Sequence, residues 1–257
     1  MQNSDPVKIE WDGPIAILTL STPGKLNAFT LEMRNKLIDL FTELNADPRC
    51  RAIVFTGAEQ NLTAGGDVRS FNDKSIAGGR ARIKAGSATL MRAMIGGSKP
   101  IIAAVEGYAY GAGMALTAAA DYAVAASNAK FCCAFTRLAF MPDLGMLWSL
   151  PRRVGIAQAK RLIALANTID GTEAARLGLV EEAVEPGKAL STALERAREF
   201  AATPPLAFEF VKSALAEDLE PMLRREIDLQ SMLMLSEDHE EGKLAFFEKR
   251  KPVFKGR

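Results

Sequence analysis

Short apolar runs alternate with helical patterns through the first half of the chain. Runs rich in β-branched and apolar residues predict strands at residues 15–22, 50–57, 99–107 and 121–127. Apolar residues at helical spacing predict helices at 31–47, at about 80–95 and at 113–120, and Thr30 suits the N-cap of the first of these. Strands that alternate with helices in this way predict an α/β fold with crossover connections and buried parallel strands.

The second half of the chain has a mostly helical pattern from Ile156 onward. It predicts helices at 156–166, 171–178 and 189–203, with one short strand at 179–187. Two prolines then stop the preceding helix, so we place a soft boundary at Thr203–Pro205. This divides the chain into a core, residues 1–202, and a C-terminal helical region, residues 203–257, whose surface becomes more charged.

Composition narrows the class of protein. The chain has 257 residues, of which 48% are hydrophobic, enough for a deep interior. Lys and Arg number 32 against 31 Asp and Glu, and this balance gives no electrostatic reason to expect a nucleic-acid or membrane partner. Residues 1–13 are polar and lack the layout of a signal peptide, and no apolar run is long enough to span a membrane, so we expect a cytoplasmic protein.

Cysteine and histidine are too few for several common kinds of site. The three cysteines, two of them adjacent at 132 and 133, form neither a disulfide framework nor a metal-ligand set, and they fit a reducing compartment. The only histidine is His239, within "SEDHEEGK", and its acidic neighbours predict a solvated surface residue. A Ser-His-Asp triad would have to use this residue, and no G-x-S-x-G motif supports one.

Two glycine-rich turns follow predicted strands and expose backbone N–H groups. The first, "LTAGGDVRSF", covers residues 62–71; Asp67 can cap the helical turn after it, and an ordinary strand-to-helix turn is an equally good interpretation. The second, "GYAYGAGMALTAAAD", covers residues 107–121, and its helix begins near Gly113, where N–H groups and the helix dipole favour negative charge. It is not a dinucleotide fingerprint, because Leu116 occupies the position of the third glycine.

One acid lies in an apolar stretch further along the chain. Asp143 stands between Pro142 and Leu144, where burial would raise the pKa of a carboxyl and let it act as a base near neutral pH. Because Pro, Asp and Gly are all turn formers, "PDLG" is also read as a simple turn, and composition alone favours that reading. Residues 73–87, rich in Gly and charge, are expected to form a mobile surface segment beside the site.

The order and spacing of these stretches resemble the crotonase superfamily, the enoyl-CoA hydratase/isomerase family. The likeness runs almost end to end, through "KLNAFTLEMRNKL", "LTAGGDV", "KPIIAAVEGYAYGAGMALTAAADYAVAA", "LPRRVGIAQAKRLI" and "EGKLAFFEKRKPVFKGR". It implies a crotonase-like ββα spiral core, with a C-terminal helical region that packs into homotrimers, often paired as hexamers. It also implies an acyl-CoA thioester as substrate and no cofactor or metal.

The resemblance further implies an oxyanion hole formed by the backbone N–H groups of Gly66 and Ala112, which would hold the thioester oxygen and stabilise an enolate. Hydratases of the family use two glutamates, and the matching positions here are Ala115 and Phe135. Other members place a single acid at the position of Asp143. The resemblance therefore favours an isomerase in which Asp143 is the sole acid/base, with Ala115 and Phe135 as an apolar pocket wall.

The remaining implied contacts are to coenzyme A. The backbone at Lys25–Ala28 and Ala64–Gly66, with Gly65 between, is expected to face the nucleotide and pantetheine. Phe246 and Lys249 resemble residues that reach CoA, often across a subunit interface, although a solvated basic helix end is an equally good interpretation. Three alternatives stay open: a hydratase that uses Asp143 and a bound water, an acyl-CoA-binding protein without activity, and a nucleophilic role of Asp143 as in dehalogenases.

Overall fold

A six-stranded sheet forms the centre of the computed structural model, which describes residues 5–72 and 75–257. The strands are β1 (Val7–Asp12), β2 (Ile15–Leu20), β3 (Ala52–Gly57), β4 (Ile101–Val105), β6 (Tyr122–Ala126) and β9 (Glu182–Val184), in the order β1-β2-β3-β4-β6-β9. β1 pairs antiparallel with β2, and every later pair is parallel. The predicted strands and their parallel pairing are confirmed, and β1 was not predicted.

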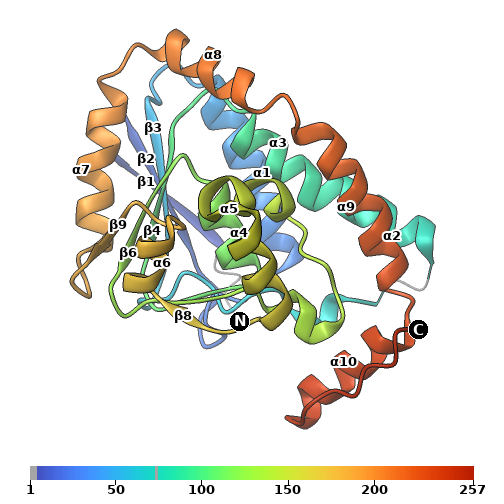
Figure 1. Cartoon of the computed structure of the whole chain (residues 1–257). Coiled ribbons are helices and arrows are strands. Elements are labelled where there is room, and N and C mark those ends of the chain that lie inside the picture. The colour runs from blue at the N-terminus through green and yellow to red at the C-terminus, as the bar shows by residue number, and fades with distance from the viewer. Residues whose placement is uncertain (1–4, 73–74) are drawn as a thin grey trace.

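Helices cover both faces of this sheet (Figure 1). On one face, three alanines of α7 (Ala189–Ala201) pack against Val54, Ile102 and Val124 of the central strands. Together they form the smaller of two hydrophobic clusters. The neighbouring residues of the same strands, such as Ile53 and Phe55, point to the other face, because side chains alternate along a strand. There they meet α1 (Leu31–Ala46), α3 (Thr89–Ile95) and α4 (Ala112–Ala119) in the main core.

A smaller sheet lies beside the first and helps to position the site. Its strands are β5 (Tyr108–Tyr110), β7 (Lys130–Cys132) and β8 (Ile169–Asp170), in the order β5-β7-β8. Strands of two or three residues carry no periodicity, and the sequence did not predict them. Among the described residues, a short 3-10 helix at Val68–Ser70 lies within the first glycine-rich turn, and another at Ala134–Leu138 follows β7.

The helical predictions are confirmed, with one longer element than expected. α5 (Met146–Leu165) begins ten residues before Ile156, and it contains Pro151 and a kink at Gly155, where φ is 77°. Proline and glycine in its first half hid its beginning. α6 (Gly171–Leu177) and α7 lie where predicted. The boundary at residues 202–203 lies between α7 and α8 (Pro205–Leu215), and the division into core and helical region stays a prediction.

Residues 76–95 form a continuous helical run, which contains the predicted helix at about 80–95 and the described part of the segment expected to be mobile from residue 76 on. α2 (Ile76–Ile83) leads into a π-helical turn at Lys84–Ala88 and then into α3. Gly79, Gly86 and Ser87 are buried, because α9 (Leu219–Leu233) and α1 pack against this run. Asp73 and Lys74 of the predicted mobile segment, and residues 1–4 of the polar N-terminal stretch, lie outside the described residues.

The last helix, α10 (Glu237–Glu248), lies away from the central sheet at the lower right of Figure 1. It contacts the short helix at Ala134–Leu138. Among the described residues, no helix is long and apolar enough to cross a membrane.

Candidate active site

The two glycine-rich turns lie side by side. Thr63 donates its N–H to the carbonyl of Tyr108 at 2.8 Å, and Tyr110 donates to the carbonyl of Thr63 at 3.0 Å. A Cβ on Gly65 would come within 3.2 Å of the Tyr110 carbonyl oxygen. Since Gly65 and Gly111 have φ of 105° and 50°, glycine is required both for the conformation and for the close approach.

Each turn leaves one backbone N–H group without a hydrogen-bond acceptor among the described residues. Neither the Gly66 nor the Ala112 N–H has an acceptor within the described part of the chain, and both residues line the same cavity. Ala112 is the first residue of α4, so the positive end of the helix dipole lies there too. Two unpaired donors from adjacent turns are suited to binding an oxygen that gains negative charge.

The cavity beside these turns has a volume of about 320 Å³ and a largely apolar wall. Aromatic rings form much of that wall, from Phe29, Phe71, Phe135, Phe140 and Phe246. The charged side chains that line it are Arg34, Arg82, Arg137 and Asp143. Its size and lining are typical of a small-molecule site.

Asp143 is the only carboxylate among the described lining residues. It lies in the loop before α5, and Ser87 Oγ donates a hydrogen bond to its Oδ2 at 2.9 Å. Burial raises the pKa of Asp143, while the Ser87 hydrogen bond and the charges of Arg82 and Arg34 act in the opposite direction. Leu144 and Gly145 after it both have positive φ, 56° and 64°, so the loop makes a tight left-handed turn that fixes the carboxyl.

A second acid, Glu226 on α9, lies behind this loop and does not line the cavity. Its side chain is 1% exposed, and its Oε2 accepts the Gly145 N–H at 3.0 Å. Burial, with the charge of Asp143 next in size, raises the pKa of Glu226 to about 8. Glu226 therefore supports the turn that carries Asp143, and sequence reasoning missed it. The available signal was that Glu226 and Gln230 occupy the buried stripe of α9, between Leu223 and Ser231.

Two arginines lie near Asp143 in the same cavity. Burial lowers the pKa of Arg34, and the positive charge of Arg82 lowers it further, while the charge of Asp143 raises it. The guanidinium of Arg82 stands 4.7 Å from the centre of the Phe71 ring. Sequence reasoning named neither arginine, because both come from helices whose charged residues are typical of a solvated face.

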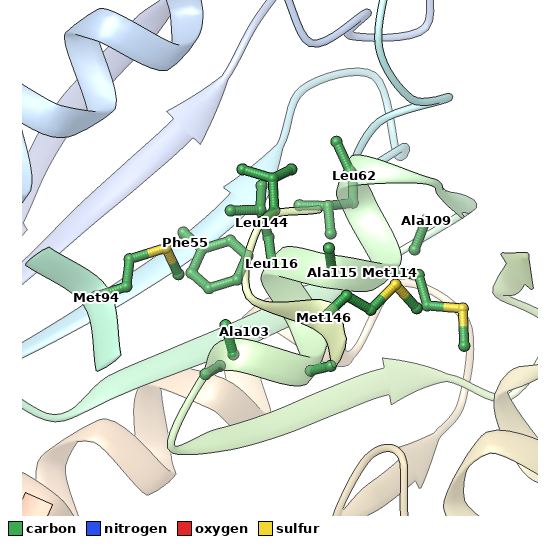
Figure 2. Packing of buried hydrophobic residues seen from close by; sticks show 14 of the residues in the cluster. Phe55, Leu62, Met94, Ala103, Ala109, Met114, Ala115, Leu116, Leu144 and Met146 are labelled. Atoms are coloured by element: carbon green, nitrogen blue, oxygen red, sulfur yellow. The ribbon is translucent and has the colours of Figure 1, made fainter. Parts of the chain in front are cut away.

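The structure brings most of the sequence-predicted site residues to the cavity wall. These are Ala64, Gly65, Gly66, Ala112, Phe135, Asp143 and Phe246. The exception among the expected wall residues is Ala115, which is fully buried and packs in the core near Leu62, Leu144 and Met146 (Figure 2). Its methyl group is too short to reach past these larger side chains, so the expectation that Ala115 forms pocket wall is wrong.

Of the residues expected to contact CoA, Ala64–Gly66 and Phe246 line the cavity, and Lys25, Ala28 and Lys249 do not. Lys25 is exposed and Ala28 is partly buried; their loop joins the first glycine turn through the Ala64 N–H, which donates to the Leu26 carbonyl at 2.9 Å. Phe246 is 57% exposed although it lines the cavity, and Lys249 follows it at the end of α10. Neither lysine lines the cavity.

The prediction that His239 is a solvated surface residue is wrong. His239 is 1% exposed, and its ring stacks on Phe140 with centroids 4.0 Å apart. Its Nδ1 donates to the Leu138 carbonyl at 2.9 Å. The acidic neighbours in the sequence point to solvent on one face of α10, while His239 lies on the opposite face against the short helix that carries Phe135 and Leu138.

Asp67 and Asp121 have structural positions, and the cap predicted at Asp67 is confirmed. Asp67 accepts the Arg69 N–H at 3.1 Å and caps the short helix at Val68–Ser70. Asp121 forms a buried ion pair with Lys212 at 2.6 Å and accepts the Ile101 N–H at 2.8 Å. No cluster of three or more potential metal ligands is found within residues 5–72 and 75–257.

This fold places two open backbone N–H groups and, among the described lining residues, one carboxyl around an apolar cavity, an arrangement typical of enzymes that stabilise an oxyanion. Residues 10–257 match the enoyl-CoA hydratase/isomerase family, and the chain belongs to that family, within the crotonase superfamily. It is 37% identical to a probable enoyl-CoA hydratase of Rhodobacter capsulatus, over 98% of each chain. It is 33% identical to a 1,2-epoxyphenylacetyl-CoA isomerase of Escherichia coli, over 95% of each chain.

Solved structures show the same fold. OdaA of Pseudomonas aeruginosa aligns with a TM-score of 0.84 at 28% identity, covering 95% of this chain and 99% of that one. The enoyl-CoA hydratase/isomerase of Pseudoalteromonas atlantica aligns with a TM-score of 0.86 at 26% identity, covering 97% and 100%. The crotonase-like α/β fold is thus confirmed, and the chain is an enzyme, an enoyl-CoA isomerase or hydratase.

Proposed function

We propose that the chain is an enoyl-CoA isomerase that moves a double bond of an acyl-CoA with Asp143 as its only acid/base. The observation that carries this proposal is the single carboxylate of the cavity. Hydration with two glutamates needs one group for water and another for the α-proton, and Ala115 and Phe135 occupy the matching positions. Glu226 does not replace them, because it lies behind the Asp143 loop and its Oε2 is bonded to Gly145.

The chemistry follows from the two parts of the site. Asp143 takes a proton from C2 of a 3-enoyl thioester, and the electrons move onto the thioester oxygen to give a dienolate. The Gly66 and Ala112 N–H groups stabilise that oxygen, each worth about 10²–10³ in rate. Asp143 then returns the proton to C4, which leaves the 2-enoyl thioester. A positioned general base contributes about 10²–10⁴, and the raised pKa of Asp143 suits both directions of transfer.

The thioester itself supplies the only carrier group that this reaction needs, so we propose no cofactor and no metal. The loop at Lys25–Ala28, the turn at Ala64–Gly66, and Phe246 with Lys249 are proposed to hold the coenzyme A. The support is that Ala64–Gly66 and Phe246 line the cavity, and that the Ala64 N–H joins the Lys25–Ala28 loop to this turn through the Leu26 carbonyl. Lys249 and Phe246 act from the same chain or from a neighbouring subunit.

We further propose a homotrimer, or a hexamer of two trimers, built on the C-terminal helices. Large apolar side chains on α8 are exposed, with Leu206 64%, Phe210 67% and Leu215 71% exposed. Exposed apolar surfaces of this kind mark sites of association. Light scattering on the purified protein tests this, and a monomer at micromolar concentration would contradict it.

The test of the proposed reaction uses hex-3-enoyl-CoA and the change in absorbance as the 2-enoyl thioester forms. Wild type is expected to turn it over, and Asp143→Asn to lose about 10²–10⁴ of the rate. Asp67→Asn is the matched control, because Asp67 is a cap that does not line the cavity. Isomerisation at the wild-type rate by Asp143→Asn would overturn the proposal.

Hydration is the second candidate, because the Rhodobacter capsulatus relative is named as a probable enoyl-CoA hydratase. In that case Asp143 would activate a water and also handle the α-proton. Crotonyl-CoA distinguishes the two, since a hydratase consumes its conjugated double bond and an isomerase of this type leaves it. Loss of crotonyl-CoA absorbance faster than turnover of hex-3-enoyl-CoA would favour hydration.

A further inference from the structure

The inner part of the cavity contains polar groups that the proposed reaction does not use. Moving a double bond along a plain alkyl chain needs Asp143 and the two backbone donors, and the rest of the pocket can be apolar. Here Arg34 from α1 and Gln230 from α9 also line it. Both belong to the region around Asp143, whose charge acts on Arg34.

The Arg34 guanidinium has no hydrogen-bonding partner among the described residues. Its Nε is buried and has no acceptor, and no hydrogen bond or ion pair of its side chain is found in the described part of the chain. It lies directly against Gly86, where a Cβ would overlap the guanidinium. Gly86 belongs to the π-helical turn at Lys84–Ala88, so the backbone of that turn makes the space for Arg34.

Gln230 presents a second unused polar group to the same cavity. Its side chain is 2% exposed, its Oε1 is buried without a donor, and its amide forms no hydrogen bond within the described residues. Rotation of the amide by half a turn offers N–H groups in place of the oxygen. Leaving buried polar atoms without partners costs free energy, and such atoms are therefore typical of sites that a ligand completes.

The charges of the cavity indicate the sign of that ligand. Arg34, Arg82 and Arg137 line it against the single carboxylate of Asp143. Asp143 already accepts from Ser87 and forms no ion pair with Arg34 within the described residues. A guanidinium with free N–H groups binds a carboxylate through two parallel hydrogen bonds, and this pairing also neutralises its positive charge.

We propose that the acyl group of the natural substrate carries a carboxylate, which Arg34 binds with the help of the Gln230 amide. The substrate class is then a dicarboxylic acyl-CoA, with one carboxyl joined to CoA as a thioester and the other free. The inference rests on the proposed acyl-CoA function of the same site. It adds no covalent step, because the free carboxylate is bound and not transformed.

Equilibrium binding tests the inference without turnover. Hexanoyl-CoA and adipyl-CoA have saturated chains of equal length that differ in a terminal methyl or carboxylate, and glutaryl-CoA with valeryl-CoA repeats the comparison for a shorter chain. Wild type is expected to bind the dicarboxylic member of at least one pair about tenfold more tightly. Arg34→Met should weaken that binding about 10- to 100-fold and leave the monocarboxylic partner nearly unchanged.

Two further variants keep the result interpretable. Lys36→Met on the same helix is the matched control, because Lys36 pairs with Asp5 on the surface and does not line the cavity. Arg34→Lys keeps the positive charge but loses the planar guanidinium, so it should retain part of the preference for the dicarboxylic thioester. It replaces Arg34→Met in the test if that variant does not fold. The affinity for free CoA is measured in parallel. If a variant binds free CoA more weakly, its loss of affinity arises at the CoA part of the ligand and not at the acyl group.

The outcomes separate this inference from the proposed reaction. Equal affinity of wild type for both members of each pair would overturn it, and so would an Arg34→Met loss that is the same for free CoA and for every thioester. If hex-3-enoyl-CoA is isomerised while no carboxylate preference is found, only this inference fails. If the preference is found and neither hex-3-enoyl-CoA nor its 6-carboxylate analogue reacts, only the isomerase proposal fails.

Discussion

The hydroxyl of Ser87 donates a hydrogen bond to Asp143 Oδ2 at 2.9 Å, and this bond joins the π-helical turn at Lys84–Ala88 to the loop that carries the candidate base. It opposes the effect of burial, which raises the pKa of Asp143. A hydrogen bond to the ionised form keeps a carboxyl available as a base at lower pH. Ser87 thereby sets where on the pH scale the proposed isomerase works.

Ser87→Ala tests this role. Without the hydroxyl the pKa of Asp143 rises further, so the acid limb of the pH–rate profile should move to higher pH by about one unit. The profile of kcat on hex-3-enoyl-CoA measures it. Ser191→Ala, which removes an exposed hydroxyl bonded to the Lys188 carbonyl, is the control and should not move the limb. A limb that stays in place or moves to lower pH would show that Ser87 does not stabilise the ionised base.

Glu226 makes the stability of the folded protein depend on pH. Its pKa is about 8 in the folded chain and near 4.5 when unfolded, so between these values the folded state holds a proton that the unfolded state has lost. The contribution of Glu226 to the free energy of unfolding is therefore greatest at low pH, and it falls as the pH rises toward 8. The neutral side chain in Glu226→Gln removes this term while keeping an oxygen for the Gly145 N–H.

The expected result is a stability difference that grows with pH. Glu226→Gln should gain on wild type by about 1 kcal/mol per pH unit between pH 5 and pH 8, and the gain should level off above that. Urea unfolding at several pH values measures it, with Glu195→Gln on the exposed side of α7 as control. A difference that is constant over this range would mean that Glu226 is ionised in the folded protein.

His239 gives the opposite dependence. Its Nδ1 donates to the Leu138 carbonyl, and its Nε2 is buried without a partner. Burial lowers the pKa of His239, because protonation would place a charged N–H at the buried Nε2, away from water and without an acceptor among the described residues. A base whose folded pKa is depressed contributes stability above its unfolded pKa, and that contribution is lost as pH falls through the folded pKa.

We therefore expect wild type to lose stability relative to His239→Gln as the pH falls from 7.5 to 5.5. The Gln amide can still donate to Leu138 and does not titrate. Urea unfolding at the two pH values measures the relative change. An equal loss in both proteins would assign the acid sensitivity to other groups.

The central sheet could be predicted from the sequence because buried parallel strands are continuous apolar runs, as in "AIVF" of β3 and "IIAAV" of β4. The short strands β5, β7 and β8 could not, since two or three residues have no period and pair only because the turns beside them are already close. The beginning of α5 was hidden by Pro151 and Gly155, which in this chain lie inside a kinked helix.

The candidate site was predictable only in part. Glycine turns carry their own signal, but it was the resemblance to the crotonase superfamily that singled out Gly66 and Ala112 within them. The same resemblance favoured Asp143 as a base, where composition alone favoured a simple turn. Arg34 and Gln230 face the cavity because of how α1 and α9 pack around the run at 76–95. Periodicity places a residue on a face of its helix, but it does not say which other helix that face meets. His239 was misplaced for the same reason.

The last prediction concerns Gly86 and Arg34. Alanine in place of a helical glycine ordinarily stabilises a protein by about 0.5–1 kcal/mol. At Gly86 the new Cβ would overlap the Arg34 guanidinium, which is the movable end of a flexible side chain, so Gly86→Ala should displace Arg34 and forfeit this gain. It should also weaken adipyl-CoA more than hexanoyl-CoA, because the displaced guanidinium is the group proposed to bind the carboxylate.

A double-mutant cycle isolates this contact. In the Arg34→Ala background the space beside Gly86 is empty, so adding Gly86→Ala should cost little or even stabilise, and the coupling free energy should reach about 0.5–3 kcal/mol. Lys36→Ala with Gly86→Ala is the control cycle, and it should be additive, because Lys36 is not among the atoms near Gly86. Additivity of the Arg34 cycle in urea unfolding would mean that Arg34 does not rest on the π-helical turn, and the geometry offered for carboxylate binding would fail with it.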